Sequence, residues 1–308
     1  MKIYSNFNEN NIKQLKDRCV VVIGCFDGVH LGHQEIFKTA LKIKRPEEKL
    51  CVFTFNTSSF APVKKADTLK IITNSEKYYL FEKMGVDVCF CPSFEDVSNL
   101  STEQCVYLIL KQFLNAKAVV VGTDFRFGKN ASGDINILST LCNNAGIVCK
   151  IVDKISLDEK IISSSQIREY ITTGNIEKAN QMLGYNFFYF CKVITGNKIG
   201  RTLNFPTINQ KIEPNKISPP FGVYLSSVEI EFKTYCGITN IGIKPTVGSN
   251  YPLCETYVDG FDGNLYDKII KTSIIKKIRN EKKFDNLDQL KNQISIDCKI
   301  AKEYFKNI

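Results

Sequence analysis

A run of β-branched residues followed by a glycine loop constrains this chain more than any other stretch. Val20-Val21-Val22-Ile23 has the pattern of a buried strand, and Gly24 and Gly28 mark a tight turn directly after it. Residues 34–43 then place apolar side chains at helical spacing. The stretch therefore predicts a strand, a glycine loop and the start of a helix.

The chain contains only two histidines, and both lie in this loop, at His30 and His33. A helix N-terminus presents free backbone N–H groups and the positive end of the helix dipole, so it binds phosphate oxygens. Two imidazoles at such a place would stabilise the charge that develops on a phosphate under attack. The simpler alternative is that one histidine caps the helix and the other fills space. The absence of histidine elsewhere favours the catalytic interpretation.

The composition is that of a folded globular protein with room for two domains. The chain has 308 residues, of which 44% are hydrophobic and 24% are charged. No apolar run approaches the roughly 18 residues of a membrane span, and the first residues show no signal-peptide pattern. We therefore expect a cytoplasmic protein with no membrane partner.

Cysteine content and charge exclude two further classes. The 12 cysteines are scattered through expected strands and helices, which favours reduced, buried thiols over a disulfide framework. The net charge of +9 is spread along the chain except at residues 271–283, and no stacking-aromatic motif accompanies it. We expect no nucleic-acid partner. The sequence leaves the oligomeric state open.

Strands and helices alternate in the first 184 residues, which predicts an α/β domain with a parallel sheet and helices on both faces. Further strands are expected at 50–55, 86–90, 118–121 and 147–152, and helices at 76–84, 102–114, 134–143 and, broken at Gly174, 165–183.

From residue 185 to residue 308 the pattern changes to short extended runs with turn signals, which predicts a small antiparallel β-barrel. The expected strands are 192–194, 222–230, 235–243, 255–258 and 269–270. An amphipathic helix at about 286–305 completes this second domain.

Three unusual loops of the first domain all follow strands, so a parallel sheet would bring them to one edge. Besides the histidine loop, Asp124-Phe125-Arg126-Phe127 offers two aromatic rings to hold a flat heterocycle and an arginine to meet a phosphate. The alternative is that the rings only anchor the loop. Ser163, Ser164 and Arg168 make either a plain helix cap or a triphosphate clamp.

The second domain has its own candidate site. Gly196 and Gly200 would let the backbone approach a phosphate closely. Thr207 and Asn209 lie on one face if the segment is extended, and their oxygens suit Mg²⁺. The alternative is a surface turn followed by a strand.

The first domain resembles a known family through its motifs. His30-x-Gly32-His33 is similar to the HxGH signature of the nucleotidyltransferase superfamily, and residues 24–33 and 122–128 resemble the FMN adenylyltransferase half of bacterial bifunctional riboflavin kinase/FAD synthetases. The resemblance implies a Rossmann-like nucleotidyltransferase domain in which His30 and His33 are catalytic. It also implies two sets of contacts. ATP would be bound by Gly24, Phe26, Asp27, Gly28, Ser163, Ser164 and Arg168, and the flavin by Asp124, Phe125, Arg126 and Phe127.

The second domain resembles the riboflavin kinase half of the same enzymes, with its signature at residues 196–209. The resemblance implies that Glu255 is the general base for the riboflavin hydroxyl and that Thr207 and Asn209 hold Mg²⁺. It further implies ATP contacts at Gly196, Gly200 and Arg201, and flavin contacts at Gly222, Tyr224 and Arg279.

Together the resemblances imply an enzyme that phosphorylates riboflavin to FMN and then adenylylates FMN to FAD, with ATP as co-substrate of both steps. The sequence departs from the family after Thr54-Phe55, where Asn56 begins a segment that lacks the usual Pro-His-Pro. Two alternatives therefore stand beside this interpretation, a riboflavin kinase with a degenerate adenylyltransferase domain and a non-catalytic flavin or nucleotide sensor. A transferase with another phosphate acceptor is a third, against which the kinase half argues.

Overall fold

The computed structural model describes residues 1–5, 15–56, 69–196, 205–243 and 251–306. The chain divides into two compact units, Met1–Ser164 and Ser165–Ile308. The domain boundary expected after residue 184 would group two further helices, α6 (Ser164–Thr172) and α7 (Ile176–Leu183), with the first unit. The division by compactness places nearly all of them in the second unit.

The first unit is built on a six-stranded sheet in the order β1-β4-β3-β2-β5-β6, and every neighbouring pair is parallel. Its strands are β1 (Lys2–Tyr4), β2 (Cys19–Ile23), β3 (Lys49–Phe53), β4 (Val88–Phe90), β5 (Ala116–Gly122) and β6 (Val148–Val152). The α/β fold with a parallel sheet is thus confirmed. The expected strands are present, and β1 is an additional edge strand.

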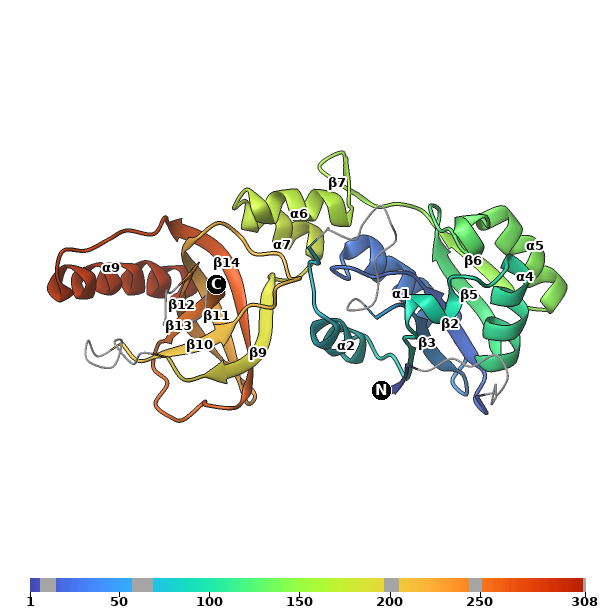
Figure 1. Ribbon diagram of the computed structural model, residues 1–308, viewed down its shortest axis with the longest axis horizontal. Coiled ribbons are helices and arrows are strands. Elements are labelled where there is room, and N and C mark those ends of the chain that lie inside the picture. The colour runs from blue at the N-terminus through green and yellow to red at the C-terminus, as the bar shows by residue number, and fades with distance from the viewer. Residues whose placement is uncertain (6–14, 57–68, 197–204, 244–250, 307–308) are drawn as a thin grey trace. The chain divides into compact units, whose positions relative to one another are not determined.

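Helices cover both faces of this sheet, and Figure 1 shows α2 on one side of the central strands and α5 on the other. The helices of the first unit are α1 (Leu31–Ile43), α2 (Asn74–Lys83), α3 (Phe94–Val97), α4 (Thr102–Gln104) and its wider continuation η2 (Cys105–Phe113), the short η3 (Lys129–Ala131) and α5 (Ile135–Ala145). A two-stranded hairpin, β7 (Ser156–Leu157) with β8 (Lys160–Ile161), follows β6.

The central strand β2 is buried along its whole length because it packs on both faces. Val21 and Ile23 belong to the core beneath η2 and α5, while the alternate residues Val20 and Val22 point to the opposite face. Helix α1 lies against β2 and β5 on that opposite face. The glycine loop that joins β2 to α1 is therefore fixed at both ends by buried elements.

The second unit is a closed six-stranded barrel in the order β10-β13-β12-β11-β14-β9, with antiparallel neighbours throughout. Its strands are β9 (Phe188–Ile194), β10 (Thr207–Lys211), β11 (Gly222–Ile230), β12 (Lys233–Ile243), β13 (Pro252–Val258) and β14 (Ile269–Arg279). The expected barrel is confirmed, and β14 is much longer than the two residues predicted for it.

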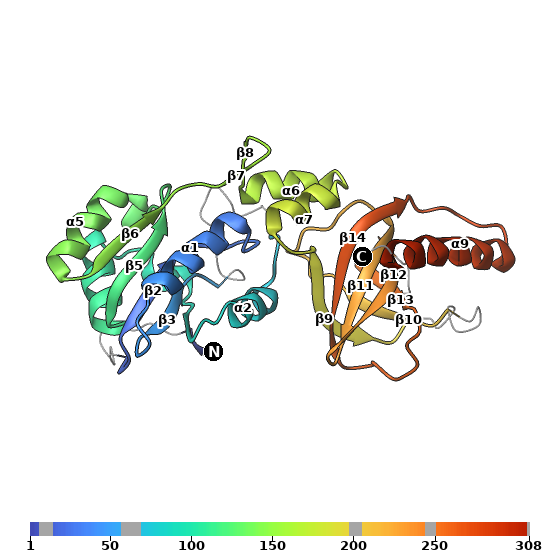
Figure 2. The same cartoon turned by 180° about the vertical axis from the view of Figure 1, so that it is seen from behind.

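The C-terminal helix α9 (Leu287–Lys306) packs beside the barrel (Figure 2). Its Cys298 and Ala301 form a core cluster with Val223 and Leu225 of β11. Tyr224, between these two strand residues, points to the opposite side and is fully buried in the barrel interior. Helix α9 therefore covers part of the outer face of the barrel. None of the helices in the described part of the chain has the length and hydrophobicity required to cross a membrane.

Candidate active sites

The histidine loop lies at the switch point of the parallel sheet. From β2 the chain continues to β3 on one side, and β5 later pairs with β2 on the other side. Ligands of open parallel sheets bind at the carboxyl ends of the strands where the strand order reverses. The loops after β2 and β5, which contain residues 24–30 and 123–128, both start from this edge.

His30 and His33 form a stacked pair at the start of α1. Their ring centroids are 3.6 Å apart and their planes differ by 16°. His30 is the N-cap of the helix, and its Nδ1 accepts a hydrogen bond from the backbone N–H of His33 at 3.3 Å. Because Nδ1 is an acceptor, the proton of a neutral His30 ring lies on Nε2. The capping role and the proposed catalytic role therefore use different nitrogens of one side chain.

Burial lowers the pKa of His33 well below the ordinary value of a histidine, and the neighbouring charges of His30 and Lys77 lower it further. The ring packs edge-on against Phe26, with centroids 5.2 Å apart. Among the buried side-chain polar atoms of the described segments, Nδ1 of His33 is the one without a hydrogen-bond partner. His33 is thus neutral at pH 7.

The predicted nucleotide-binding residues of the loop include groups with structural partners. Asp27 is buried, and its Oδ1 accepts hydrogen bonds from the backbone N–H groups of Ile71 (2.9 Å) and Ile72 (3.3 Å). Ser164 Oγ donates to the backbone oxygen of Asp27 at 2.8 Å, so the structure brings the predicted serine segment to the histidine loop. Asp27 thereby joins the loop to two distant segments of the chain.

Two glycines of the loop, Gly28 and Gly32, occupy positions where a side chain would be strained or crowded. Gly28 has a φ of 83°, which favours glycine, and Phe26 adopts a φ of 50°. A Cβ atom at Gly32 would lie 3.2 Å from Nδ1 of His30. Gly32 therefore leaves the space in which the His30 ring sits beside its own helix.

The loop after β5 holds its two phenylalanines in parallel. The rings of Phe125 and Phe127 are stacked with centroids 5.7 Å apart, and both pack against the core of the first unit. The charged side chains of Asp124 and Arg126, on either side of Phe125 in the chain, are more exposed. Arg126 Nη1 lies 3.9 Å from Asp134 Oδ2, and Asp124 Oδ2 lies 3.1 Å from Lys154 Nζ. Both the anchoring interpretation and a flavin contact at the rings fit this arrangement.

Asn56 and Arg168 are two further positions that the family motifs single out. Asn56, where the family's Pro-His-Pro would begin, accepts a hydrogen bond at Oδ1 from Nδ2 of Asn74 at 2.6 Å. Arg168 lies on α6 within the second compact unit. Its proposed contact with the triphosphate stays a prediction, as does that of Ser163.

Three of the residues predicted for the barrel site, Asn209, Glu255 and Arg279, lie along one row that crosses five strands. Asn209 of β10 pairs with Glu255 of β13, Glu255 with Asn240 of β12, Asn240 with Val223 of β11, and Val223 with Arg279 of β14. Directly paired residues point to the same side of a sheet. Since Val223 faces α9, the row lies on the outer face of the barrel.

Glu255, Thr207 and Asn209 form a compact group of oxygen donors at one end of this row. Thr207 Oγ1 donates a hydrogen bond to Glu255 Oε1 at 2.9 Å. Thr207 and Asn209 share a face of β10, as expected for an extended segment. A Cβ atom at Gly196 would lie 2.5 Å from Asn209 Nδ2, so a larger residue there would displace the Asn209 side chain. Gly200 and Arg201 lie outside the described residues.

A donor set of hydroxyl, amide and carboxylate oxygens is the kind that Mg²⁺ prefers. The described segments contain no group of three His, Cys, Asp or Glu side chains that would hold a metal ion. The fit to magnesium therefore rests on Thr207 and Asn209 next to Glu255, and a metal here would complete its coordination with substrate phosphates or water.

The predicted flavin contacts of the barrel have structural partners of their own. Tyr224 donates a hydrogen bond from its hydroxyl to the Pro220 carbonyl, and burial raises its pKa to about 12. The Arg279 guanidinium makes a bidentate bond to Asp297 of α9, with Nη2 2.8 Å from Oδ2. Gly222 packs so closely on β14 that a Cβ would lie 2.6 Å from the Arg279 carbonyl oxygen. Their roles in flavin binding stay predictions.

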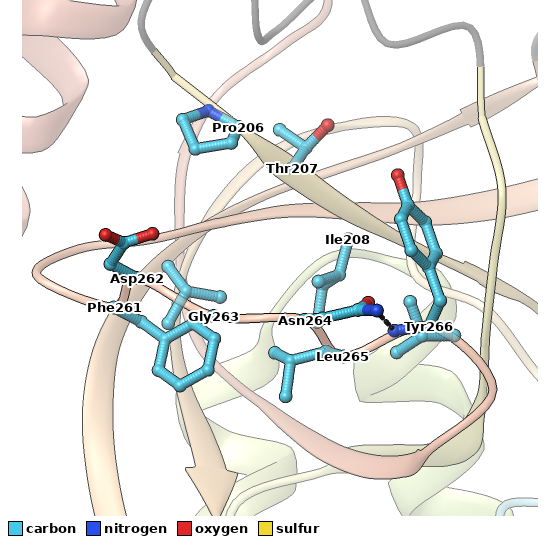
Figure 3. A pocket seen from close by; sticks show the side chains of 11 residues that line it. Pro206, Thr207, Ile208, Phe261, Asp262, Gly263, Asn264, Leu265 and Tyr266 are labelled. Carbon is cyan, nitrogen blue, oxygen red and sulfur yellow. Dashed lines mark hydrogen bonds between the residues drawn. The ribbon is translucent and has the colours of Figure 1, made fainter.

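A pocket of about 560 Å³ adjoins Thr207, and Figure 3 shows the side chains that line it, most of them from a segment that no sequence motif marks. Residues 261–266, in the connection between β13 and β14, form that segment, and Val193 and Ile208 also line the pocket. Asn264 Oδ1 accepts from the backbone N–H of Tyr266 at 3.0 Å and so stabilises the turn. In the sequence, this segment is marked by its position directly after the strand that contains Glu255.

Comparison with known proteins assigns both halves of the chain. A family model described as FAD synthetase matches residues 12–166, and one described as riboflavin kinase matches residues 183–305. The chain belongs to the bifunctional riboflavin kinase/FMN adenylyltransferase family. The two matches occur in the order that the motifs predicted, so the resemblance drawn from the sequence is confirmed.

Curated members of this family align over nearly the whole chain. The bifunctional riboflavin kinase/FMN adenylyltransferase of Buchnera aphidicola subsp. Schizaphis graminum is 37% identical, with 97% of this chain and 98% of the relative covered. That of Bacillus subtilis is also 37% identical, with 96% of each covered. A Streptococcus pneumoniae crystal structure described as a macrolide-efflux protein is similar with a TM-score of 0.83 and 27% identity, covering 98% of this chain and 99% of that one.

Proposed function

We propose that this chain converts riboflavin to FMN in its barrel unit and FMN to FAD in its α/β unit, in the cytoplasm, with ATP consumed in both steps. The observation that carries this proposal is that both family models match, in order, on a chain that holds two distinct candidate sites. Retention of His30, His33 and Glu255 favours catalysis over a sensor, because a binding protein has no need of groups that serve chemistry.

In the adenylylation step a phosphate oxygen of FMN attacks the α-phosphorus of ATP, and pyrophosphate leaves. The N-terminus of α1 and the Nε2–H of His30 would bind the oxygens on which charge develops. His33, neutral and packed on His30, would fix the orientation of that ring. No covalent intermediate with the enzyme is required, so positioning and charge stabilisation supply the catalysis.

In the kinase step the 5′-hydroxyl of riboflavin attacks the γ-phosphorus of ATP. Glu255 would take the proton of that hydroxyl, and the hydrogen bond from Thr207 to its Oε1 would orient the carboxylate. The pocket beside Thr207, which is lined by polar and apolar groups in equal measure, is of a size that suits part of a nucleotide. Bound Mg²⁺, held by Thr207 and Asn209, would offset the charge of the phosphates.

Labelled ATP tests the two reactions separately. With riboflavin as substrate and ATP labelled at the γ-phosphorus, we expect the label in FMN. With FMN as substrate and ATP labelled at the α-phosphorus, we expect the label in FAD and the release of pyrophosphate. Label in FMN but none in FAD would replace this proposal with a kinase whose first domain is inactive. Label in neither product would favour the sensor.

Omission of Mg²⁺ should abolish both incorporations, and unchanged kinase labelling without any divalent cation would refute the metal role of Thr207 and Asn209.

A further inference from the structure

Lys77 of helix α2 is a buried cation beside the histidine loop. Its side chain has no exposed surface. The helix starts at a complete capping box, in which Thr73 and Glu76 bond reciprocally, so the first turn that positions Lys77 is firmly held. No sequence pattern distinguishes this residue, because one lysine among 41 basic residues is expected at the surface.

The ammonium joins the ends of two parallel strands. Nζ donates to the backbone oxygen of Cys25, just after β2, at 3.3 Å. It also donates to the backbone oxygen of Phe55, just after β3, at 3.1 Å, and makes a longer contact of 3.5 Å to Thr54 Oγ1. Thr54 in turn donates to the Cys25 oxygen at 3.3 Å. Three acceptors match the three hydrogens of the ammonium.

Stability alone does not explain a lysine at this position. Burial of a charged amine costs free energy, and the contacts of Nζ are neutral oxygens rather than a carboxylate. Burial accordingly lowers the pKa of Lys77, against the opposing field of Asp27. An apolar side chain of similar length would fill the same space at lower cost.

We propose that Lys77 is a positioning residue for adenylyl transfer, whose buried ammonium fixes the start of the histidine loop to the end of the neighbouring strand. The inference rests on the proposed function of the first unit. With its hydrogens occupied, Lys77 acts through the loop and does not touch substrate. It holds Cys25, and hence the turn that leads to His30 and His33.

The charge of Lys77 has a second effect, on His33. The groups that face His33 are His30 at the start of α1 and Lys77 on α2, and both positive charges lower the pKa of His33. Lys77 itself is faced by Asp27, Cys25, Cys89 and Cys91. Loss of the ammonium therefore raises the pKa of His33, which a purely structural role of the methylenes would not do.

The test compares Lys77→Met, which removes bonds and charge, with Lys77→Gln, which keeps a neutral donor. Lys83→Met, an exposed position of the same helix, is the matched control. For Lys77→Met we expect kcat for FAD formation from FMN to fall on the order of 100-fold, with little change in KM, because small displacements of catalytic groups cost about that much. Lys77→Gln should keep more activity. Kinase activity should be unchanged in all three variants, and far-UV circular dichroism of each variant is the folding control for the first unit.

Imidazole NMR provides the second readout, because the chain has only two histidines and therefore only two sets of signals. We expect the His33 titration to move to higher pH in both Lys77 variants and to stay unchanged in Lys83→Met. If Lys77→Met does not fold, Lys77→Gln decides. Wild-type kcat together with an unmoved His33 titration would overturn the inference. A wild-type protein that makes no FAD would refute the proposed function instead, and the titration would still test the influence of Lys77 on His33.

Discussion

His30 and His33 stack with 3.6 Å between their ring centroids, and the backbone N–H of His33 donates to Nδ1 of His30. The same turn of helix thus makes one histidine the cap and places the other on top of it. Two protonated rings at this separation would repel each other strongly, so the pair accommodates one positive charge at most. The lowered pKa of His33 indicates which of the two rings stays neutral.

Replacement of His30 should affect adenylylation only. In His30→Gln the cap is partly preserved by the amide oxygen, whereas the proposed Nε2–H donor is lost. We expect the rate of FAD formation to fall on the order of 100-fold or more, which is typical of losing a hydrogen-bond donor to the transition state. The rate of riboflavin phosphorylation should be unchanged. Rates of both steps, measured on one preparation with FMN and with riboflavin, check this. Equal loss of both activities in a folded protein would show that His30 acts through the fold.

Glu255→Gln should have the opposite effect. The amide keeps the size of the side chain and still accepts a hydrogen bond from Thr207, but it cannot take the proton of the riboflavin hydroxyl. We expect riboflavin phosphorylation to be lost by about 100-fold or more and FAD formation from FMN to be spared. The exposed Glu213→Gln in the same unit serves as the control. Kinase activity that survives in Glu255→Gln would remove Glu255 from the role of general base.

Stability should depend on pH through His33. The folded pKa of His33 lies below that of the unfolded chain, so the unfolded state takes up a proton that the folded state refuses. The contribution of this group is therefore fully favourable above about pH 6.5 and is lost progressively as the pH falls from there toward the folded pKa. Denaturant unfolding of wild type and His33→Asn between pH 5 and pH 8 measures it. A wild-type slope equal to that of His33→Asn would contradict the prediction.

Arg279 and Asp297 should stabilise the contact between β14 and α9. Asp297 is almost fully buried and also accepts from Gln293 Nε2 at 3.0 Å, while Arg279 is partly exposed. Arg279→Met leaves the carboxylate without its cation, which we expect to cost about 2–3 kcal/mol, less than for a fully buried pair. Replacement of both residues by apolar side chains should recover part of the loss.

The exposed pair of Lys302 with Asp259 supplies the control, since Lys302→Met should cost less than about 1 kcal/mol. Unfolding free energies of the three variants test the stability claim. The KM for riboflavin, measured on folded Arg279→Met, tests the separate prediction that Arg279 contacts the flavin. A rise in KM would support a flavin contact, and an unchanged KM would restrict Arg279 to its structural pair.

Local patterns in the sequence predicted the elements but not their long-range partners. The β-branched run identifies β2 and the apolar spacing identifies α1, because each pattern involves only residues that are close along the chain. Strand β14 was predicted over two residues and spans Ile269–Arg279, since its three lysines and the buried polar residues Thr272 and Ser273 hide its alternation. The row that joins Asn209 to Arg279 depends on the registers of four strand pairs, which no local signal encodes.

The site residues also divide into those that a local pattern identifies and those that depend on contacts between distant parts of the chain. The histidines and the glycines of their loop could be identified because their chemistry is unusual and adjacent in the chain. Lys77 could not, because its contacts with Cys25 and Phe55 span 52 and 22 positions. The wall of the pocket beside Thr207 could not either, since it forms only when the connection after β13 folds back over β10.

The central claim is that one chain makes FAD from riboflavin through free or bound FMN. The most direct measurement is a time course of the purified protein with riboflavin, excess ATP and Mg²⁺, in which the flavins are separated by chromatography and detected by fluorescence. We predict that FMN appears first and FAD follows while riboflavin is consumed. Accumulation of FMN with no FAD at any time would contradict the account, because it would mean that the first unit is inactive despite His30 and His33.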